Sequence, residues 1–393
     1  MLSSFEKGII TLINNALKGE KNPLPEDFDY SRLHDFSVSQ KIIPLIYYGA
    51  KNDSRFLSCG AANKLKYATF YSAAISDLQM KEAELIFAEF DKHDIDYMGL
   101  KGVGMKKLYP SSDMRMMGDI DVLVRDEQQD NIDEVMQSLG YSFQLESDHE
   151  RIWNKGKVHL ELHKRIVPSY NRDFYAYFGN GWKLAKKKDD RSCEYIMSTE
   201  DEFVFLFTHF AKHYRDAGIG IIHAVDIYVF MENHKDMDRE YVKQAFEKLC
   251  LYRFFVNVCN MLDVWFSGAE CDEMSEFLTY KLFESGAYGT QKNSIMSQAL
   301  IHSKGSDVDD VRRKKLAILI FPPYKNMCYD YPWLNGKPLL LPIAWVVRIF
   351  KVLLFKRDNL KTHSKNIKSI NKANVDAYQA ELNYVGLDFN FEV

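Results

Sequence analysis

The segment Tyr97–Arg125 reads YMGLKGVGMKKLYPSSDMRMMGDIDVLVR, and the interpretation of the whole 393-residue chain starts from it. Its last part predicts a β-strand, because the β-branched residues Ile120, Val122 and Val124 alternate with other residues. Side chains two apart on a strand lie on the same side of the sheet, so these three are expected to be buried together.

Carboxylates occupy the other side of this predicted strand. Asp119 and Asp121 are two apart and are expected to project together, and a divalent cation such as Mg2+ is the usual compensation for their repulsion. A second alternating segment, Val158–His163, places Glu161 on its polar side between two histidines. If the two strands are neighbours, the three carboxylates form the ligand set of a two-metal phosphoryl-transfer site.

A glycine turn, Leu100–Gly104 (LKGVG), follows an expected strand at Ile95–Leu100. Gly102 and Gly104 permit positive φ and close approach of the backbone to a ligand. A helix beginning after the turn would aim its free N–H groups at a phosphate, and Lys101 and Arg115 would supply positive charge. The alternative is an ordinary corner between a strand and a helix, because short glycine motifs are common.

Taken together, these motifs resemble the bacterial family of uncharacterised nucleotidyltransferases, part of the superfamily with a DNA polymerase β-like core. That family carries an LKG turn, a YP pair, an R-x-x-GDID stretch and a later D/E-L-H strand. The corresponding segments here are Leu100–Gly102, Tyr109–Pro110, Arg115–Val124 and Glu161–His163. The likeness is strongest over residues 90–230, although Lys101-Gly102 replaces the Gly-Gly or Gly-Ser pair of the wider superfamily.

The resemblance implies a Mg2+-dependent transfer of a nucleoside monophosphate from an NTP, ATP first among them, to a hydroxyl group. The acceptor is left open between a small molecule, a saccharide and a protein. Asp119 and Asp121 would bind two Mg2+ ions, and Glu161 would complete the site and act as general base. A nucleotide-binding protein with weak catalysis remains an alternative.

Several other residues are expected around the nucleotide. In the resembling family a helical domain closes over the site, which implies that two histidines four residues apart and a following aspartate line the cleft. The alternative for the histidines is a structural pair at a helix interface. A third histidine, on the Glu161 strand, is expected to hydrogen-bond a carboxylate or the substrate. The expected nucleotide-binding residues are Lys101, Gly102, Gly104, Arg115, His163, His209, His213 and Asp226.

The composition indicates a globular protein, with 46% hydrophobic and 27% charged residues. A net charge of −4 argues against a protein that binds nucleic acid by bulk electrostatics. The six cysteines lack CxxC spacing, which favours reduced thiols and a cytoplasmic location. The two histidines that flank Glu161 raise the alternative of zinc, but a strand does not supply the helical HExxH arrangement.

The predicted fold class is α+β, with a small mixed-sheet nucleotidyltransferase core between helical regions. The expected divisions are a helical N-terminal region at 1–92, the core at 93–198 and a helical C-terminal domain at 199–393. Val38–Tyr48 suggests a helix that Pro44 bends or divides, and Val242–Phe266 has continuous helical periodicity.

The segment Leu339–Phe355 is strongly apolar, but it is too short and too charged for a membrane span. Lys351, Lys356 and Arg357 would suit a helix lying at a membrane surface, as in a peripheral protein of envelope or polysaccharide assembly. The favoured alternative is a helix that packs on the preceding helices. The sequence does not define the oligomeric state.

Overall fold

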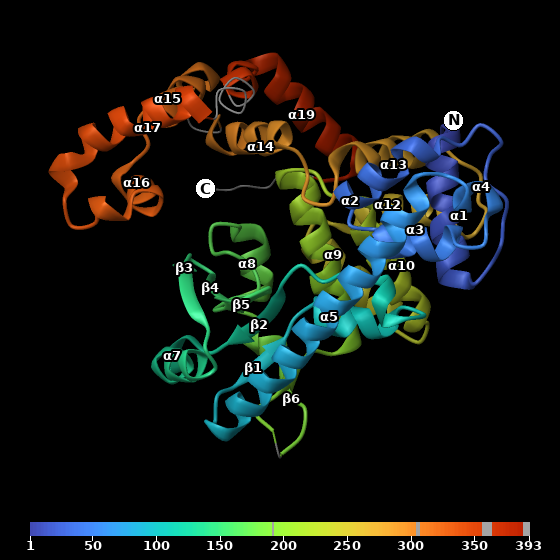
Figure 1. Ribbon diagram of the computed structural model, residues 1–393, viewed down its shortest axis with the longest axis horizontal. Coiled ribbons are helices and arrows are strands. Elements are labelled where there is room, and N and C mark those ends of the chain that lie inside the picture. Colours follow the sequence, from blue (N-terminus) through green and yellow to red (C-terminus); the bar gives the residue numbers. More distant parts are fainter. Residues whose placement is uncertain (191, 304–306, 356–363, 388–393) are drawn as a thin grey trace. The chain divides into compact units, whose positions relative to one another are not determined.

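A five-stranded mixed sheet carries the quoted segment in the computed structural model, which describes residues 1–190, 192–303, 307–355 and 364–387 (Figure 1). The strands are β1 (Tyr97–Gly99), β2 (Ile120–Val124), β3 (Ser142–Glu146), β4 (Glu150–Lys155) and β5 (Val158–His163). Their order is β1-β2-β5-β4-β3; β2 and β5 are parallel, and the other neighbours are antiparallel. The sheet and its helical flanks confirm the predicted α+β class. A separate hairpin pairs β6 (Lys186–Lys187) with β7 (Tyr195–Ile196).

Helices precede and follow the sheet. Those up to residue 287 are α1 (Ser4–Lys18), α2 (Leu33–Ser39), α3 (Ile43–Ala50), α4 (Ser54–Leu57), α5 (Ala61–Lys92), α6 (Gly102–Met105), α7 (Gln129–Ser138), α8 (Arg172–Phe178), α9 (Thr199–Asp216), α10 (Ile221–Asn233), α11 (Arg239–Lys248), α12 (Tyr252–Phe266) and α13 (Glu273–Ser285). The later ones are α14 (Gln291–Ser303), α15 (Val308–Ile320), α16 (Tyr324–Asp330), α17 (Leu341–Phe355) and α19 (Lys372–Val385).

The described chain divides into two compact units. The first contains residues 1–212, 219–287 and the described residues from Gly386 onward, so it holds the N-terminal helices, the sheet and α10 to α13. The second contains residues 213–218 and 288–385. The expected N-terminal region and core therefore belong to one unit, together with the first helices of the expected C-terminal domain.

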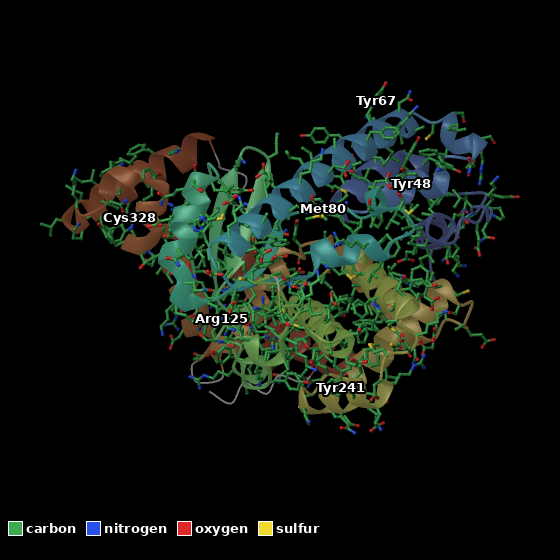
Figure 2. All side chains as sticks on the ribbon, turned by 90° about the horizontal axis from the view of Figure 1, so that it is seen from below. Tyr48, Tyr67, Met80, Arg125, Tyr241 and Cys328 are labelled. Carbon is green, nitrogen blue, oxygen red and sulfur yellow. The ribbon has the colours of Figure 1, made fainter. Side chains whose placement is uncertain are left out.

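Alternation along the strands produces the core of the first unit. Ile120, Val122 and Val124 of β2 are buried with Leu160 and Leu162 of β5, as the period of two predicts. Helices α5 and α7 contribute apolar side chains to this same cluster, and Met80 of α5 packs against it (Figure 2). Because these helices cover one face of the sheet, the polar side chains of β2 and β5 are directed to the opposite face.

Two local breaks interrupt the predicted helices. The Val38–Tyr48 segment is divided before the proline: α2 ends at Ser39, Lys41 has a φ of 57°, and Pro44 lies in the first turn of α3, where proline is tolerated. The helical periodicity of Val242–Phe266 corresponds to two helices: α11 ends at Lys248, and Cys250 has a φ of 55° before α12 begins. A residue in this left-handed region ends a helix.

The apolar segment near the C-terminus forms α17 in the second unit. Within the described ranges, no helix is both long enough and apolar enough to cross a membrane. Lys356 and Arg357, which entered the expectation of an interfacial helix, lie outside the described residues.

Candidate functional site

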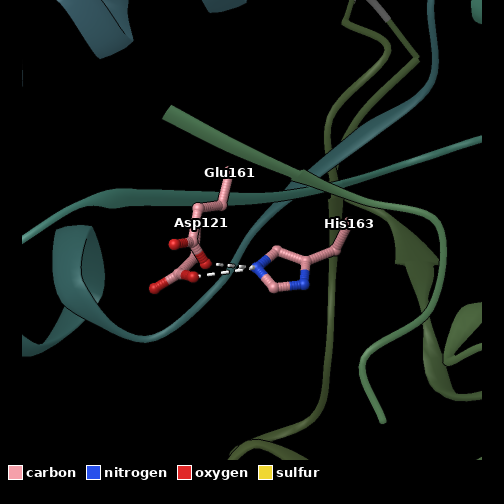
Figure 3. Close-up of side chains that lie close together, drawn as sticks. All are labelled: Asp121, Glu161 and His163. Atoms are coloured by element: carbon pink, nitrogen blue, oxygen red, sulfur yellow. Dashed lines mark hydrogen bonds and ion pairs between the residues drawn. The ribbon is translucent and has the colours of Figure 1, made fainter. Parts of the chain in front are cut away.

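The register of the parallel strands β2 and β5 builds the site. Asp121 stands opposite Glu161 and Leu123 opposite His163, so the two polar residues of β5 flank the Asp121 carboxylate (Figure 3). His163 Nε2 lies 2.8 Å from Asp121 Oδ1 and 3.6 Å from Glu161 Oε2. One ligand atom from each of the three residues lies within 4.8 Å of the others, a grouping that suits a metal ion.

Asp119 directly precedes β2 rather than lying within it. Burial and the neighbouring Asp121 raise the pKa of its carboxyl, and the charges of Lys101 and His159 act in the opposite direction. Among the described residues, the close metal-ligand group contains Asp121 and Glu161 but has His163 in place of Asp119. The three predicted carboxylates thus share one electrostatic environment, with Asp119 outside the tightest cluster.

Opposed pKa shifts mark the two central carboxyls. Burial, followed by the charges of Asp121 and Asp119, raises the pKa of Glu161 to about 8. Burial also acts on Asp121, but Lys101 and the hydrogen bond from His163 overcome it and lower its pKa to about 2. Without a cation, the protein therefore limits the repulsion by keeping a proton on Glu161 at pH 7. A bound cation would reverse this preference.

A second layer supports the imidazole of His163. Its Nδ1 is buried and lies 4.0 Å from Glu150 Oε2, while His149 Nε2 lies 3.0 Å from the same carboxylate. A carboxylate behind the second ring nitrogen is the usual arrangement for a metal-binding histidine. The sequence analysis missed Glu150, the first residue of β4, and His149, which directly precedes it, because neither belongs to a recognisable motif.

These donors fit a divalent cation. Two carboxylates are the hard oxygen ligands that Mg2+ accepts, whereas an imidazole nitrogen is better suited to Mn2+ or Zn2+. A cation bound by these residues would favour the ionised form of Glu161, whose pKa is raised in its absence. Coordination of the cation by His163 Nε2 would leave the imidazole proton on the buried Nδ1, which lies toward Glu150. His159 flanks the group, with Nε2 at 3.5 Å from Glu161 Oε1.

The Lys101 turn differs from its prediction. Gly102 and Gly104 lie within α6, a single four-residue turn of helix, and the positive φ of 43° falls on Lys101. The two glycines, which would permit positive φ, do not adopt it, and the strained residue is the lysine. An added Cβ at Gly104 would lie 3.4 Å from Glu202 Oε1, at the end of a flexible side chain, so space does not require glycine at this position. The Lys101 Nζ lies 5.3 Å from the ring centroid of Phe205 on α9.

Arg115 and Asp226, which the sequence suggested as separate site residues, bind each other. Arg115 Nε and Nη2 each lie 2.8 Å from a different oxygen of the Asp226 carboxylate, a bidentate ion pair between the loop before β2 and helix α10. Tyr109 also donates a hydrogen bond of 2.7 Å to Asp226 Oδ1. Although burial opposes it, this pairing raises the pKa of Arg115, and the guanidinium stays charged. Part of its hydrogen-bonding capacity is thus used within the protein.

The predicted histidine pair on α9 falls in different environments. The His209 ring lies 6.5 Å from Phe205 and 6.4 Å from His223, as measured between ring centroids. His213, one turn farther on, belongs to the second unit. Burial lowers the pKa of His223 to about 4, and the charges of Arg115 and Lys101 add to this effect. His223 was missed by the sequence analysis, although it precedes Asp226 by one helical turn and shares its face.

This geometry agrees with a comparison of the sequence. The family described as "Uncharacterised nucleotidyltransferase" matches residues 26–267, a range that includes the sheet, Lys101 and α9 to α12. The chain belongs to this family, and the class of protein is therefore that of the nucleotidyltransferases. No curated protein and no solved structure matches the chain.

Proposed function

We propose that this protein transfers a nucleoside monophosphate from an NTP, ATP first among them, to a hydroxyl group, in a reaction that depends on Mg2+. The observation that carries the proposal is the register of β2 and β5, which sets Asp121 beside Glu161 in a chain of the nucleotidyltransferase family. The acceptor class remains a small molecule, a saccharide or a protein side chain.

The carboxylates Asp119, Asp121 and Glu161 would hold the cations. When bound, a pair of Mg2+ ions supplies charge neutralisation for the triphosphate and the leaving pyrophosphate. The charge of Lys101 acts on all three carboxylates, and this charge would attract phosphate oxygens. The strained backbone conformation of Lys101 sets the direction in which its side chain leaves the main chain.

The reaction itself needs little covalent chemistry from the protein. The acceptor oxygen forms a bond to the α-phosphorus while the bond from that phosphorus to the bridging oxygen breaks, and pyrophosphate leaves. Glu161 in its ionised form takes the proton of the acceptor hydroxyl.

The experiment is isothermal titration of the four NTPs with Mg2+ into the wild type and into an Asp119→Ala/Asp121→Ala variant. The matched control is Glu127→Ala, which removes an exposed carboxylate just beyond β2. Metal-dependent binding of one NTP, lost in the double variant and retained in the control, is expected. Absence of binding by the wild type to all four NTPs would refute the proposal.

Turnover is then tested with the NTP that binds, labelled at its α-phosphate. Transfer of the label to a hydroxyl compound, with pyrophosphate released in equal amount, is the expected result. Nucleotide binding without pyrophosphate release across saccharides, small polyols and protein acceptors would favour the alternative of a nucleotide-binding protein with weak catalysis.

A further inference from the structure

The second unit contains a helix whose apolar side faces outward. Ile343, Val346, Val347 and Phe350 of α17 follow the spacing i, i+3, i+4, i+7 and therefore share one helix face. Their exposed fractions are 56%, 53%, 43% and 62%. Such a face is normally turned toward a protein core, so its exposure on α17 calls for a covering partner.

The opposite face of α17 explains this orientation. Ala344 is buried in a small core with Met327 and Leu334. Trp345 Nε1 donates a hydrogen bond of 2.8 Å to the Pro322 carbonyl, and Arg348 Nη1 donates one of 2.9 Å to the Leu319 carbonyl. These directional contacts anchor the helix to the end of α15, so the exposed face cannot turn inward without breaking them.

Apolar side chains that precede α17 in the chain are exposed as well. Leu339 precedes α17 and is 92% exposed, and Trp333 on the preceding turn is 44% exposed. Ile320 and Phe321 at the end of α15 are also exposed. We call the exposed side chains of α17, together with Leu339, the α17 face.

Charge selects the partner. Residues 288–385 contain sixteen Lys and Arg residues and seven Asp and Glu residues, a net charge of +9, whereas the whole chain carries −4. Lys337 and Lys351 are exposed and bracket the α17 face along the chain. Two copies of a unit with this charge would repel each other, so a self-association is disfavoured, and an anionic partner is favoured.

The side chains of the α17 face distinguish between anionic partners. Three of its four helical residues are aliphatic and offer neither hydrogen bonds nor stacking to a nucleic acid. Aliphatic and aromatic side chains with flanking lysines are instead the composition of a helix that lies in the plane of a lipid surface. We propose that the α17 face inserts at the surface of an anionic lipid bilayer, while the surrounding lysines and arginines contact the headgroups.

The test is co-sedimentation of the full-length protein with vesicles of phosphatidylcholine alone and of phosphatidylcholine with about 30% phosphatidylserine. The test variant replaces Ile343, Val346, Val347 and Phe350 with serine. The control variant replaces three exposed residues of α5, Tyr67, Tyr71 and Leu85, with serine (Tyr67 is labelled in Figure 2). Because all seven positions are exposed, both variants are expected to fold, and unchanged far-UV circular dichroism checks this.

We expect the wild type and the α5 variant to bind the anionic vesicles, with at least about a tenfold loss of partitioning for the α17 variant. Binding to neutral vesicles should be weaker than binding to anionic vesicles. Salt at 0.5 M should also weaken binding to the anionic vesicles, because it screens the attraction between the lysines and the headgroups. Equal soluble fractions of wild type and α17 variant would overturn the proposal. So would release of the wild type from vesicles by single-stranded RNA, or a concentration-dependent mass in solution that the α17 substitutions abolish. These would point to a nucleic acid or to a second copy, respectively.

Discussion

Metal binding at the site is expected to depend steeply on pH. A cation needs Glu161 as a carboxylate, but the pKa of this group in the metal-free protein is raised to about 8 by burial and by the charges of Asp121 and Asp119. The ionised fraction is then about 0.76 at pH 8.5 and about 0.03 at pH 6.5. Lowering the pH across this window should therefore weaken the apparent affinity by about 25-fold, or about 1.9 kcal/mol.

The direction of this pH dependence follows from the proton that Glu161 must release when a cation binds. At pH 7 about 0.9 of the Glu161 carboxyls carry a proton, and binding must displace it. The raised pKa of Asp119 acts in the same direction, since it too favours the protonated form in the absence of metal. Acidic solution therefore weakens binding through both groups, and alkaline solution strengthens it.

Isothermal titration with Mg2+ or Mn2+ at pH 6.5 and pH 8.5 measures the effect (the two chosen pH values bracket the pKa), and titration in buffers of different ionisation heat counts the protons. Glu161→Gln should bind more weakly and lose most of the pH dependence between these values. Glu127→Gln, at an exposed position, should behave as the wild type does. A change in affinity below about threefold, with no proton released at pH 7, would show that Glu161 is not a ligand.

Three further predictions concern neighbouring groups. His163→Ala should weaken Mn2+ binding by at least about tenfold and Mg2+ binding by less, because nitrogen ligands favour the transition metal; equal losses by titration would contradict this. Lys101→Met should weaken NTP binding by about tenfold or more while leaving thermal unfolding intact, and unchanged NTP affinity would exclude a phosphate contact. Asp226→Ala should reduce the free energy of unfolding in urea by about 3–5 kcal/mol, because it leaves the Arg115 guanidinium buried and unpaired. Arg115→Met/Asp226→Leu should recover part of that loss, and a double variant no more stable than Asp226→Ala would argue against the pair.

The alternation of the strands was readable from the sequence because it depends on a local period. Ile120, Val122 and Val124 could be assigned to one face without any knowledge of their partners, and the structure buries them together. The adjacency of β2 and β5 was only a condition in that argument, since the 33 residues 125–157 separate the two strands and include β3 and β4. The register that sets Asp121 opposite Glu161 depends on long-range pairing, which a period does not encode.

The sign of the backbone angle φ at single residues was harder to predict from the sequence. Glycine is the residue that most readily permits positive φ, and the turn offered it at Gly102 and Gly104, whereas the structure has positive φ at Lys101. The sequence also contains no sign of the break between α11 and α12 at Cys250, because the apolar period continues across this residue. Tertiary packing that overrides residue preference leaves no local signal.

Arg115 and Asp226 show why residue types alone do not assign roles at this site. Each was chosen as a charge that could face a nucleotide, but their pairing across 111 residues neutralises both charges inside the protein. The pair links the loop before β2 to α10, and Tyr109 adds a second link to the same carboxylate. An ion pair of this kind holds the loop before β2 in a fixed position relative to α10. It can therefore position Asp119, which this loop carries, without contacting a substrate. Loss of the pair should therefore change stability first, and metal affinity only through displacement of Asp119.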